Sequence, residues 1–149
     1  ITIPLIVILV SLTGSYFTSQ GMEWYDTLTL PSFTPPGSFI GIVWTAIFIL
    51  TAVSALIFWN KREDFKRKKL IVSLFLINAF LNVFWSFLFF ASRLIGAALI
   101  DAVLLEISVI ALMVFLCPVS KKASALLIPY GAWTLFAIYL NYIILSLNV

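Results

Sequence analysis

Three apolar segments of the sequence each place aromatic and amide side chains along one face of a helix. Members of each set lie three or four residues apart, so on a helix they stack above one another. They are Asn78, Asn82 and Trp85 in residues 70–92, Tyr130, Trp133, Ala137 and Asn141 in residues 123–147, and Trp44 and Phe48 in residues 38–60. Such faces can stack on a flat apolar ligand and orient it by hydrogen bonds. Each face alone is better explained by hydrogen bonding between helices, but the three together favour a ligand pocket.

Two acidic residues, Asp101 and Glu106, lie inside the apolar segment 94–116. Charged groups in lipid are costly, so each needs an explanation. Asp101 is close enough to the outward end of its segment to pair with Arg93 or to cap a water-filled cavity. Glu106 lies near mid-span, where it is either a proton-coupled or cation site or the donor or acceptor of a hydrogen bond between helices. The lack of a basic partner nearby favours the structural interpretation.

Composition excludes several other kinds of chemistry. The chain has no histidine, which rules out His-dependent zinc sites, Ser-His-Asp triads and His-ligated haem. Its one cysteine, Cys117, forms no intramolecular disulfide and no Cys-rich metal site. We therefore expect no metal site and no required cofactor. The chain has 63% hydrophobic and 10% charged residues, whereas soluble domains have roughly 25% charged residues. It therefore has too little polar surface to cover a water-soluble globule, and we expect its solvent to be a lipid bilayer.

Five apolar stretches are long enough to cross that bilayer as helices. They cover residues 2–20, 38–60, 70–92, 94–116 and 123–147, and about 20 residues span the hydrocarbon core. We expect an all-α integral membrane protein, a five-transmembrane-helix bundle forming one domain over residues 1–149. The first stretch is interpreted as a mature membrane helix and not as a signal peptide. Pro129 lies inside the last stretch, so we expect a kink there that releases the carbonyl of Ala125.

Basic residues predict the orientation of the bundle. KREDFKRKK (61–69) holds six Lys/Arg, and Lys121 and Lys122 add two, while the connections at the other end hold only Arg93. The positive-inside rule puts the basic connections and the N-terminus in the cytoplasm. A nucleic-acid-binding interpretation of 61–69 is disfavoured, because the run contains two acids and lies between two spans.

The connection between the first two spans has an unusual sequence, WYDTLTLPSFTPPGSF (24–39). Its prolines and hydroxyl side chains predispose it to a compact, ordered conformation. We expect residues 21–37 to form a lid, with Trp24, Tyr25 and Phe33 covering the mouth of the pocket.

Several motifs along the whole chain resemble the tryptophan-rich sensory protein family (TspO), also called translocator protein or peripheral benzodiazepine receptor. They are WY…LPSFTPP (24–36), the Trp44-Thr45 and Phe58-Trp59 pairs, Asn82-x-x-Trp85 followed by Phe89-Phe90, Arg93, Gly96 and Asp101, and P-Y-x-A-W-x-x-F-A-x-x-L-N-Y from Pro129 to Tyr142. The order and spacing of these motifs, more than any one of them, carry the resemblance.

The resemblance implies a homodimer of five-helix bundles with a cavity that opens toward the first loop. It implies binding of porphyrins such as protoporphyrin IX, and of synthetic isoquinoline carboxamides and benzodiazepines. Resemblance to the bacterial members of the family implies light-dependent protoporphyrin degradation, with Trp44 and Trp133 as the candidate catalytic residues. The ligand-binding residues that it implies are Tyr25, Pro36, Trp44, Phe48, Asn82, Trp85, Trp133 and Ala137.

One departure bears on the ligand and the location. The sterol-associated motif of animal members needs a basic residue shortly after Tyr142, and none follows here. This disfavours cholesterol and favours a bacterial plasma membrane over a mitochondrial outer membrane. Two other functions stay open: a transporter, indicated by Glu106 alone, and a ligand-responsive protein that signals to a partner through residues 61–69.

Overall fold

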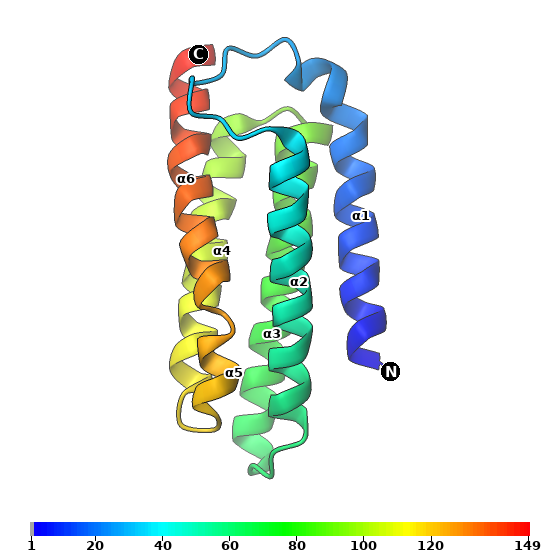
Figure 1. The fold of residues 1–149 in the computed structure, drawn as a ribbon, viewed down its shortest axis with the longest axis vertical. Helices are drawn as coiled ribbons and strands as arrows, with labels where there is room; N and C mark the ends of the chain where they lie inside the picture. The colour runs from blue at the N-terminus through cyan, green and yellow to red at the C-terminus, as the bar shows by residue number, and fades with distance from the viewer. Residues whose placement is uncertain (1) are drawn as a thin grey trace.

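The computed structural model describes residues 2–149, which form a bundle of long helices (Figure 1). The helices are α1 (Thr2–Tyr25), α2 (Gly37–Trp59), α3 (Phe65–Ser86), the π-helix η1 (Phe87–Ala91), α4 (Ile95–Leu116), α5 (Lys121–Ala125) and α6 (Ile128–Asn148). Taken with η1 joined to α3 and α5 joined to α6, five helical segments of the described chain are long and apolar enough to cross a membrane. The predicted all-α, five-span architecture is confirmed.

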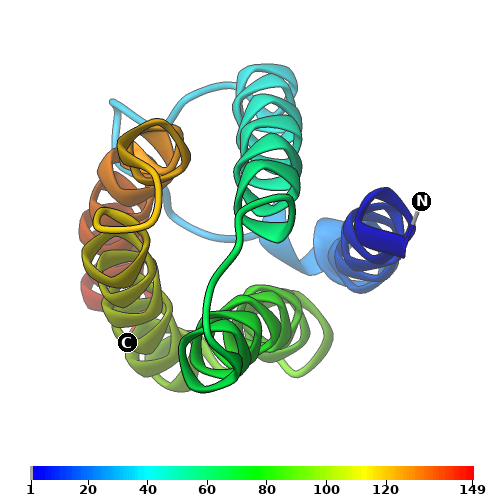
Figure 2. The ribbon, with the colours of Figure 1, turned by 90° about the horizontal axis from the view of Figure 1, so that it is seen from below.

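The spans form a ring in the order α1, α2, α6 with α5, α4, α3 (Figure 2). Helix α4 packs between α3 and α6 and is the most buried span. Its buried residues Leu105, Val109 and Leu112 recur every three or four positions, as expected of a helix that turns one stripe toward its neighbours. Helix α2 lies against α1 on one side and α5 on the other. The core is therefore α3, α4 and α6, with α1 and α2 closing the ring.

Helix α1 continues beyond its predicted end at residue 20. It ends at Tyr25, so Trp24 and Tyr25 belong to the helix and the connecting loop covers only residues 26–36. The extension is stabilised by aromatic packing, because the rings of Trp24 and Tyr25 lie 5.7 and 6.2 Å from that of Phe89. This partner is distant in sequence, so local patterns gave no sign of it.

The basic segment 61–69 is only half loop, because α3 begins at Phe65 and not at residue 70. The Asp64 carboxylate caps the new start by accepting a 2.8 Å hydrogen bond from the backbone N–H of Arg67. We call the end of the bundle that carries this segment and Lys121–Lys122 the basic end, and the opposite end the loop end.

The last turns of α3 widen into η1, where the Ser92 N–H bonds to the Phe87 carbonyl at 2.8 Å. The wider turn buries three successive residues, Leu88, Phe89 and Phe90. Helix α1 approaches this turn at Gly21, where an added Cβ would lie 2.7 Å from the Cα of Phe90. Only glycine permits that approach.

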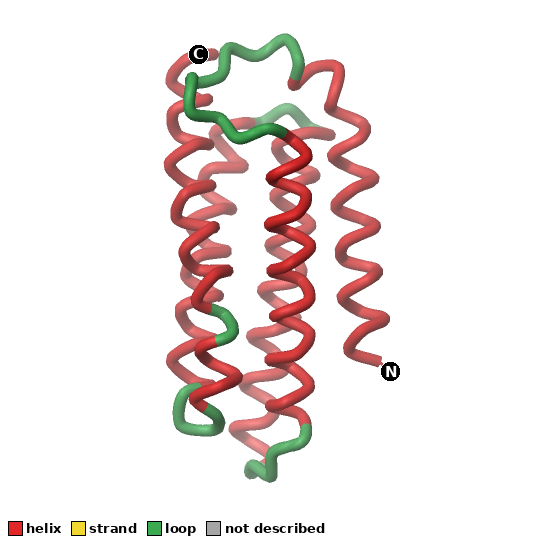
Figure 3. Tube along the Cα trace, viewed as in Figure 1, coloured by secondary structure: helices red, strands yellow, loops and turns green. Residues whose placement is uncertain are grey.

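The last span is interrupted, not merely bent. Helix α5 ends at Ala125 and α6 starts at Ile128, with Pro129 in its first turn, where proline's missing N–H costs little (Figure 3). The expected kink is thus a complete break. The Ser54 hydroxyl of α2 donates to the Ala123 carbonyl at 2.7 Å, which fixes α5 against the part of α2 nearer the basic end.

Candidate ligand-binding site

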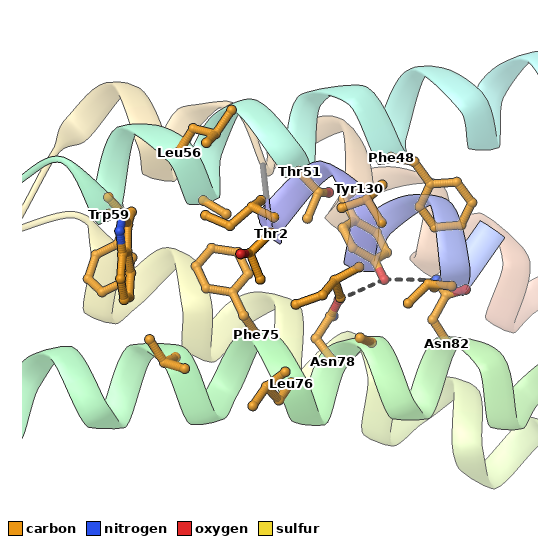
Figure 4. A pocket seen from close by; sticks show the side chains of 18 residues that line it. Thr2, Phe48, Thr51, Leu56, Trp59, Phe75, Leu76, Asn78, Asn82 and Tyr130 are labelled. Atoms are coloured by element: carbon orange, nitrogen blue, oxygen red, sulfur yellow. Dashed lines mark hydrogen bonds between the residues drawn. The ribbon is translucent and has the colours of Figure 1, made fainter.

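A chain of hydrogen bonds joins α3, α6 and α4 in the middle of the bundle. The Tyr130 hydroxyl accepts from Asn82 Nδ2 at 2.9 Å and donates to Asn78 Oδ1 at 3.0 Å (Figure 4). Asn78 Nδ2 in turn donates to the Ser108 hydroxyl at 2.9 Å. Tyr130 and Asn78 are both buried. The amide face predicted on α3 therefore meets the tyrosine of α6.

A second chain lies nearer the loop end. Trp85 Nε1 donates to Asn141 Oδ1 at 3.0 Å, and Asn141 Nδ2 donates to the Ile95 carbonyl at 3.1 Å. The interpretation of these faces as bonds between helices thus accounts for Asn78, Trp85 and Asn141. Their polar atoms are used by one another, and they hold the walls of the bundle interior in place.

An apolar cavity of about 440 Å³ lies between α1, α2 and α3 in the half of the bundle toward the basic end. Its volume falls in the lower part of the ~300–1,000 Å³ range of small-molecule sites. Figure 4 shows Trp59 at one end of it and Phe48, Asn82 and Tyr130 at the other. Of the eight ligand-binding residues that the sequence suggested, two, Phe48 and Asn82, line this cavity.

Trp44 and Trp133 lie beyond the cavity, toward the loop end, where α2 faces α6. The Trp44 ring meets the Tyr130 ring edge-on, with centroids 6.0 Å apart, and lies 5.7 Å from the Phe48 ring. Trp133 meets Phe39 of α2 at 6.2 Å. The structure thus brings Trp44, Phe48 and Asn82 together around Tyr130.

The remaining predicted residues are more scattered. Trp85 stacks on Phe89 at 4.9 Å, and Tyr25 contacts the same ring, so these two share a cluster on the α1 and α3 side. Ala137 is half-buried on α6. Pro36 is exposed and serves as the N-cap residue of α2.

The loop between α1 and α2 crosses the loop end of the bundle and passes α6 (Figure 1). Asn148 fastens it there, since its side chain accepts from the Thr29 N–H and donates to the Thr29 carbonyl, both at 2.9 Å. Phe33 stacks on Tyr139 of α6 at 5.7 Å. Phe33 is therefore the loop aromatic that covers α6, while Trp24 and Tyr25 contact η1.

Several buried polar atoms in the described chain have no hydrogen-bond partner. Among them are Trp133 Nε1, Thr51 Oγ1, Asp101 Oδ2 and Glu106 Oε2. Of the two interpretations of Asp101, the pairing with Arg93 is absent from the ion pairs of residues 2–149. Asp101 is buried, whereas Arg93 is exposed in a left-handed conformation (φ 58°) just before α4. Unpartnered donors and acceptors in a bundle interior mark places where a ligand or an ion can bind.

The cavity itself was not anticipated from the sequence. Its α1 wall consists of Thr2 and aliphatic residues such as Ile3, Val7 and Val10, whose types resemble any lipid-facing helix. Phe48, Asn78, Asn82 and Tyr130 at its inner end were signalled by their spacing, and Thr51, a hydroxyl residue in the middle of α2, was a signal that was not used.

These features define a five-span helical membrane protein with an apolar cavity inside the bundle. Residues 2–147 match the model of the TspO/MBR family. The tryptophan-rich protein TspO of Bacillus cereus is 40% identical over 125 residues, which cover 84% of this chain and 80% of the relative. The protein of the same name from Chlorobaculum tepidum is 42% identical over 144 residues, covering 93% and 89%.

Human translocator protein is 34% identical over 131 residues, which cover 87% of this chain and 78% of the human protein. The chain belongs to the TspO/MBR family, and the resemblance seen in its motifs is confirmed. It is a tryptophan-rich, multi-span membrane protein with bacterial relatives.

Proposed function

We propose that the chain binds porphyrins, protoporphyrin IX among them, and other flat hydrophobic ligands between α2, α3 and α6, beneath the loop of residues 26–36. The observation that carries the proposal is the set of contacts between α2 and α6 in the half of the bundle toward the loop end. The contacts are aromatic edges, Trp44 on Tyr130 and Phe39 on Trp133. A planar aromatic ligand can replace such contacts with stacking of the same kind, worth about 0.5–1.5 kcal/mol per ring pair beyond burial.

Ligand entry at this site requires α2 to move, because the contacts of Trp44 with Tyr130 and of Phe39 with Trp133 close the space between α2 and α6. The part of α2 toward the basic end is fixed by the hydrogen bond from Ser54 to the α5 backbone and by the buried ring of Phe58. The part toward the loop end, from Gly37 to Phe48, has one buried residue, Ile47. We expect this second part to swing outward and admit the ligand from the loop end.

Two polar groups are placed to orient the ligand. The Trp133 indole N–H is buried and has no partner, so it can donate to a carbonyl or a propionate without breaking an existing bond. Asn82 is half-buried, and one of its N–H groups is held by Tyr130, which leaves its carbonyl oxygen and second N–H for a ligand.

Light-dependent degradation is part of the proposal, with light and O₂ as co-reactants. Excited protoporphyrin takes one electron from the indole of Trp44 or Trp133, which leaves an oxidised indole and a porphyrin anion. O₂ then takes that electron and becomes superoxide. Superoxide takes up a proton from water and a hydrogen atom from the macrocycle and leaves as hydrogen peroxide, so the macrocycle is oxidised by one electron. Each superoxide formed in this way requires one indole electron, so the tryptophans themselves should show oxidation.

The test is protoporphyrin IX titration of the purified chain in lipid nanodiscs, followed by illumination. Wild type is compared with Trp44→Phe and Trp133→Phe, and Trp59→Phe at the basic end is the matched control. The proposal predicts saturable binding in all four proteins. It also predicts that bleaching is slowed at least several-fold in Trp44→Phe and Trp133→Phe and not in Trp59→Phe. These results together support both porphyrin binding and the photochemical role of the indoles. Equal bleaching in all four removes the photochemical role of the indoles, and absence of saturable binding overturns the porphyrin proposal.

A transport function is the second candidate, and the unpartnered carboxylate oxygens of Asp101 and Glu106 favour it. Glu106 faces α6 at Gly131, where an added Cβ would lie 3.4 Å from its Oε1. If a proton or cation is coupled to ligand movement, Glu106→Gln should abolish flux across proteoliposomes while leaving ligand affinity unchanged. Unchanged flux in that variant would exclude this coupling.

We also propose that the protein forms a homodimer in a bacterial plasma membrane, with its N-terminus in the cytoplasm. Cys117, exposed beyond α4 at the basic end, is a natural probe of that orientation. A membrane-impermeant maleimide should label it in inverted vesicles and not in intact cells. The reverse pattern would contradict the orientation.

A further inference from the structure

The cavity at the basic end has the shape of a narrow channel. It runs along α2 from Trp59 to Phe48 (Figure 4), a distance of ~16 Å at ~1.5 Å per residue. A volume of about 440 Å³ over that length gives a mean width of roughly 5 Å. One hydrocarbon chain fits a channel of this width, whereas the face of a macrocycle does not.

The side of the channel formed by α1 allows access from the bilayer. The close packing of α1 lies in its C-terminal half, where Gly21 meets Phe90 and the ring of Phe17 lies 5.3 Å from that of Phe87. The N-terminal half contributes Ile3 and Ile6 to the channel wall, and Ile6 is 37% exposed. An apolar chain can therefore enter sideways between α1 and its neighbours.

The end of the channel at Trp59 is cationic. Lys68 Nζ lies 4.1 Å above the Trp59 ring, and Lys68 takes no part in the ion pair found among residues 2–149, which joins Arg67 and Glu63. Lys61 and Arg62 follow Trp59 in the chain after Asn60. An ammonium group held over the edge of an apolar channel complements a ligand with one anionic group at the end of its chain.

We propose that this channel binds a long-chain fatty acid taken from the surrounding membrane. The carboxylate pairs with Lys68 beside Trp59, and the chain extends along α2 toward Phe48. The channel is roughly as long as an extended fourteen-carbon chain, from the ~16 Å estimate above. The channel ends at one ammonium group beside Trp59, so the ligand that it complements is a single-chain amphiphile with one anionic group.

The test uses native mass spectrometry of the purified chain with tetradecanoic acid, and tetradecan-1-ol as the uncharged comparison. Ala55→Leu fills the channel from α2, while Ala46→Leu places the same group on the exposed side of that helix. Lys68→Gln removes the cation above Trp59, and Lys66→Gln removes a neighbouring exposed one. Thermal unfolding of each variant verifies its fold. If Ala55→Leu does not fold, Ala79→Leu fills the channel from α3 instead.

We expect one tetradecanoic acid per wild-type chain, with affinity at least tenfold weaker in Ala55→Leu and several-fold weaker in Lys68→Gln. The alcohol should bind several-fold more weakly than the acid, and both control variants should match wild type. Equal binding by Ala55→Leu and Ala46→Leu, or equal affinity for acid and alcohol, overturns the proposal. Neither result depends on Trp44 or Trp133, so the fatty-acid and porphyrin proposals can fail separately.

Discussion

Replacing Tyr130 by phenylalanine removes the hydroxyl at the centre of the bundle while keeping the ring that Trp44 contacts. The hydroxyl makes two hydrogen bonds, from Asn82 at 2.9 Å and to Asn78 at 3.0 Å. Bonds between helices in a membrane are worth about 0.6 kcal/mol each on average, up to about 1.7. The variant also leaves the buried Asn78 carbonyl oxygen without its donor, which adds to the cost. We expect a loss of about 1–2 kcal/mol in the free energy of unfolding.

The assay is equilibrium unfolding in mixed micelles, with Tyr142→Phe as the control. Tyr142 lies on the same helix but is 55% exposed, so the same chemical change should alter stability by less than about 0.5 kcal/mol. A double-mutant cycle with Asn78→Leu should show coupling, because the second substitution removes the group that the first leaves unpaired. Equal effects of Tyr130→Phe and Tyr142→Phe would refute the view that this hydroxyl joins α3 to α6.

Two further predictions concern the loop end. Gly21→Ala should destabilise the bundle by about 1–3 kcal/mol, because the new Cβ would lie 2.7 Å from the Cα of Phe90. The control is Gly14→Ala, where the nearest atom is an ordinary 3.7 Å away, and it should leave the free energy of unfolding unchanged. Equal effects of the two substitutions would contradict the close approach of α1 to η1. Asn148→Ala should release the loop from α6 by removing both bonds to Thr29, which hydrogen exchange would detect as faster exchange of the Thr29 amide; an unchanged rate would mean that the loop is held in another way.

Periodicity alone predicted which polar side chains turn inward. Amide and indole groups are costly in lipid, so the spacing of Asn78, Asn82 and Trp85 restricted them to the bundle interior. Their partners Tyr130 and Asn141 followed from the same argument applied to the last span, and the structure joins the two faces by hydrogen bonds.

The features that the sequence did not predict depend on contacts between distant residues. The end of α1 at Tyr25 depends on Phe89, and the wide turn of η1 depends on the approach of Gly21. Pro129 indicated a distortion, but whether the helix bends or stops depends on how α5 is held by Ser54 and by its other neighbours. Half of the residues that line the cavity are aliphatic, and such residues look alike in sequence whether they face lipid or a ligand.

The most direct test of the porphyrin proposal is to locate the bound ligand by hydrogen exchange with and without protoporphyrin IX in nanodiscs. Binding between α2 and α6 predicts slower exchange in residues 26–48 and around Trp133, with little change in residues 51–59 and 65–79. Protection confined to the latter segments would place the porphyrin in the channel at the basic end and contradict the account.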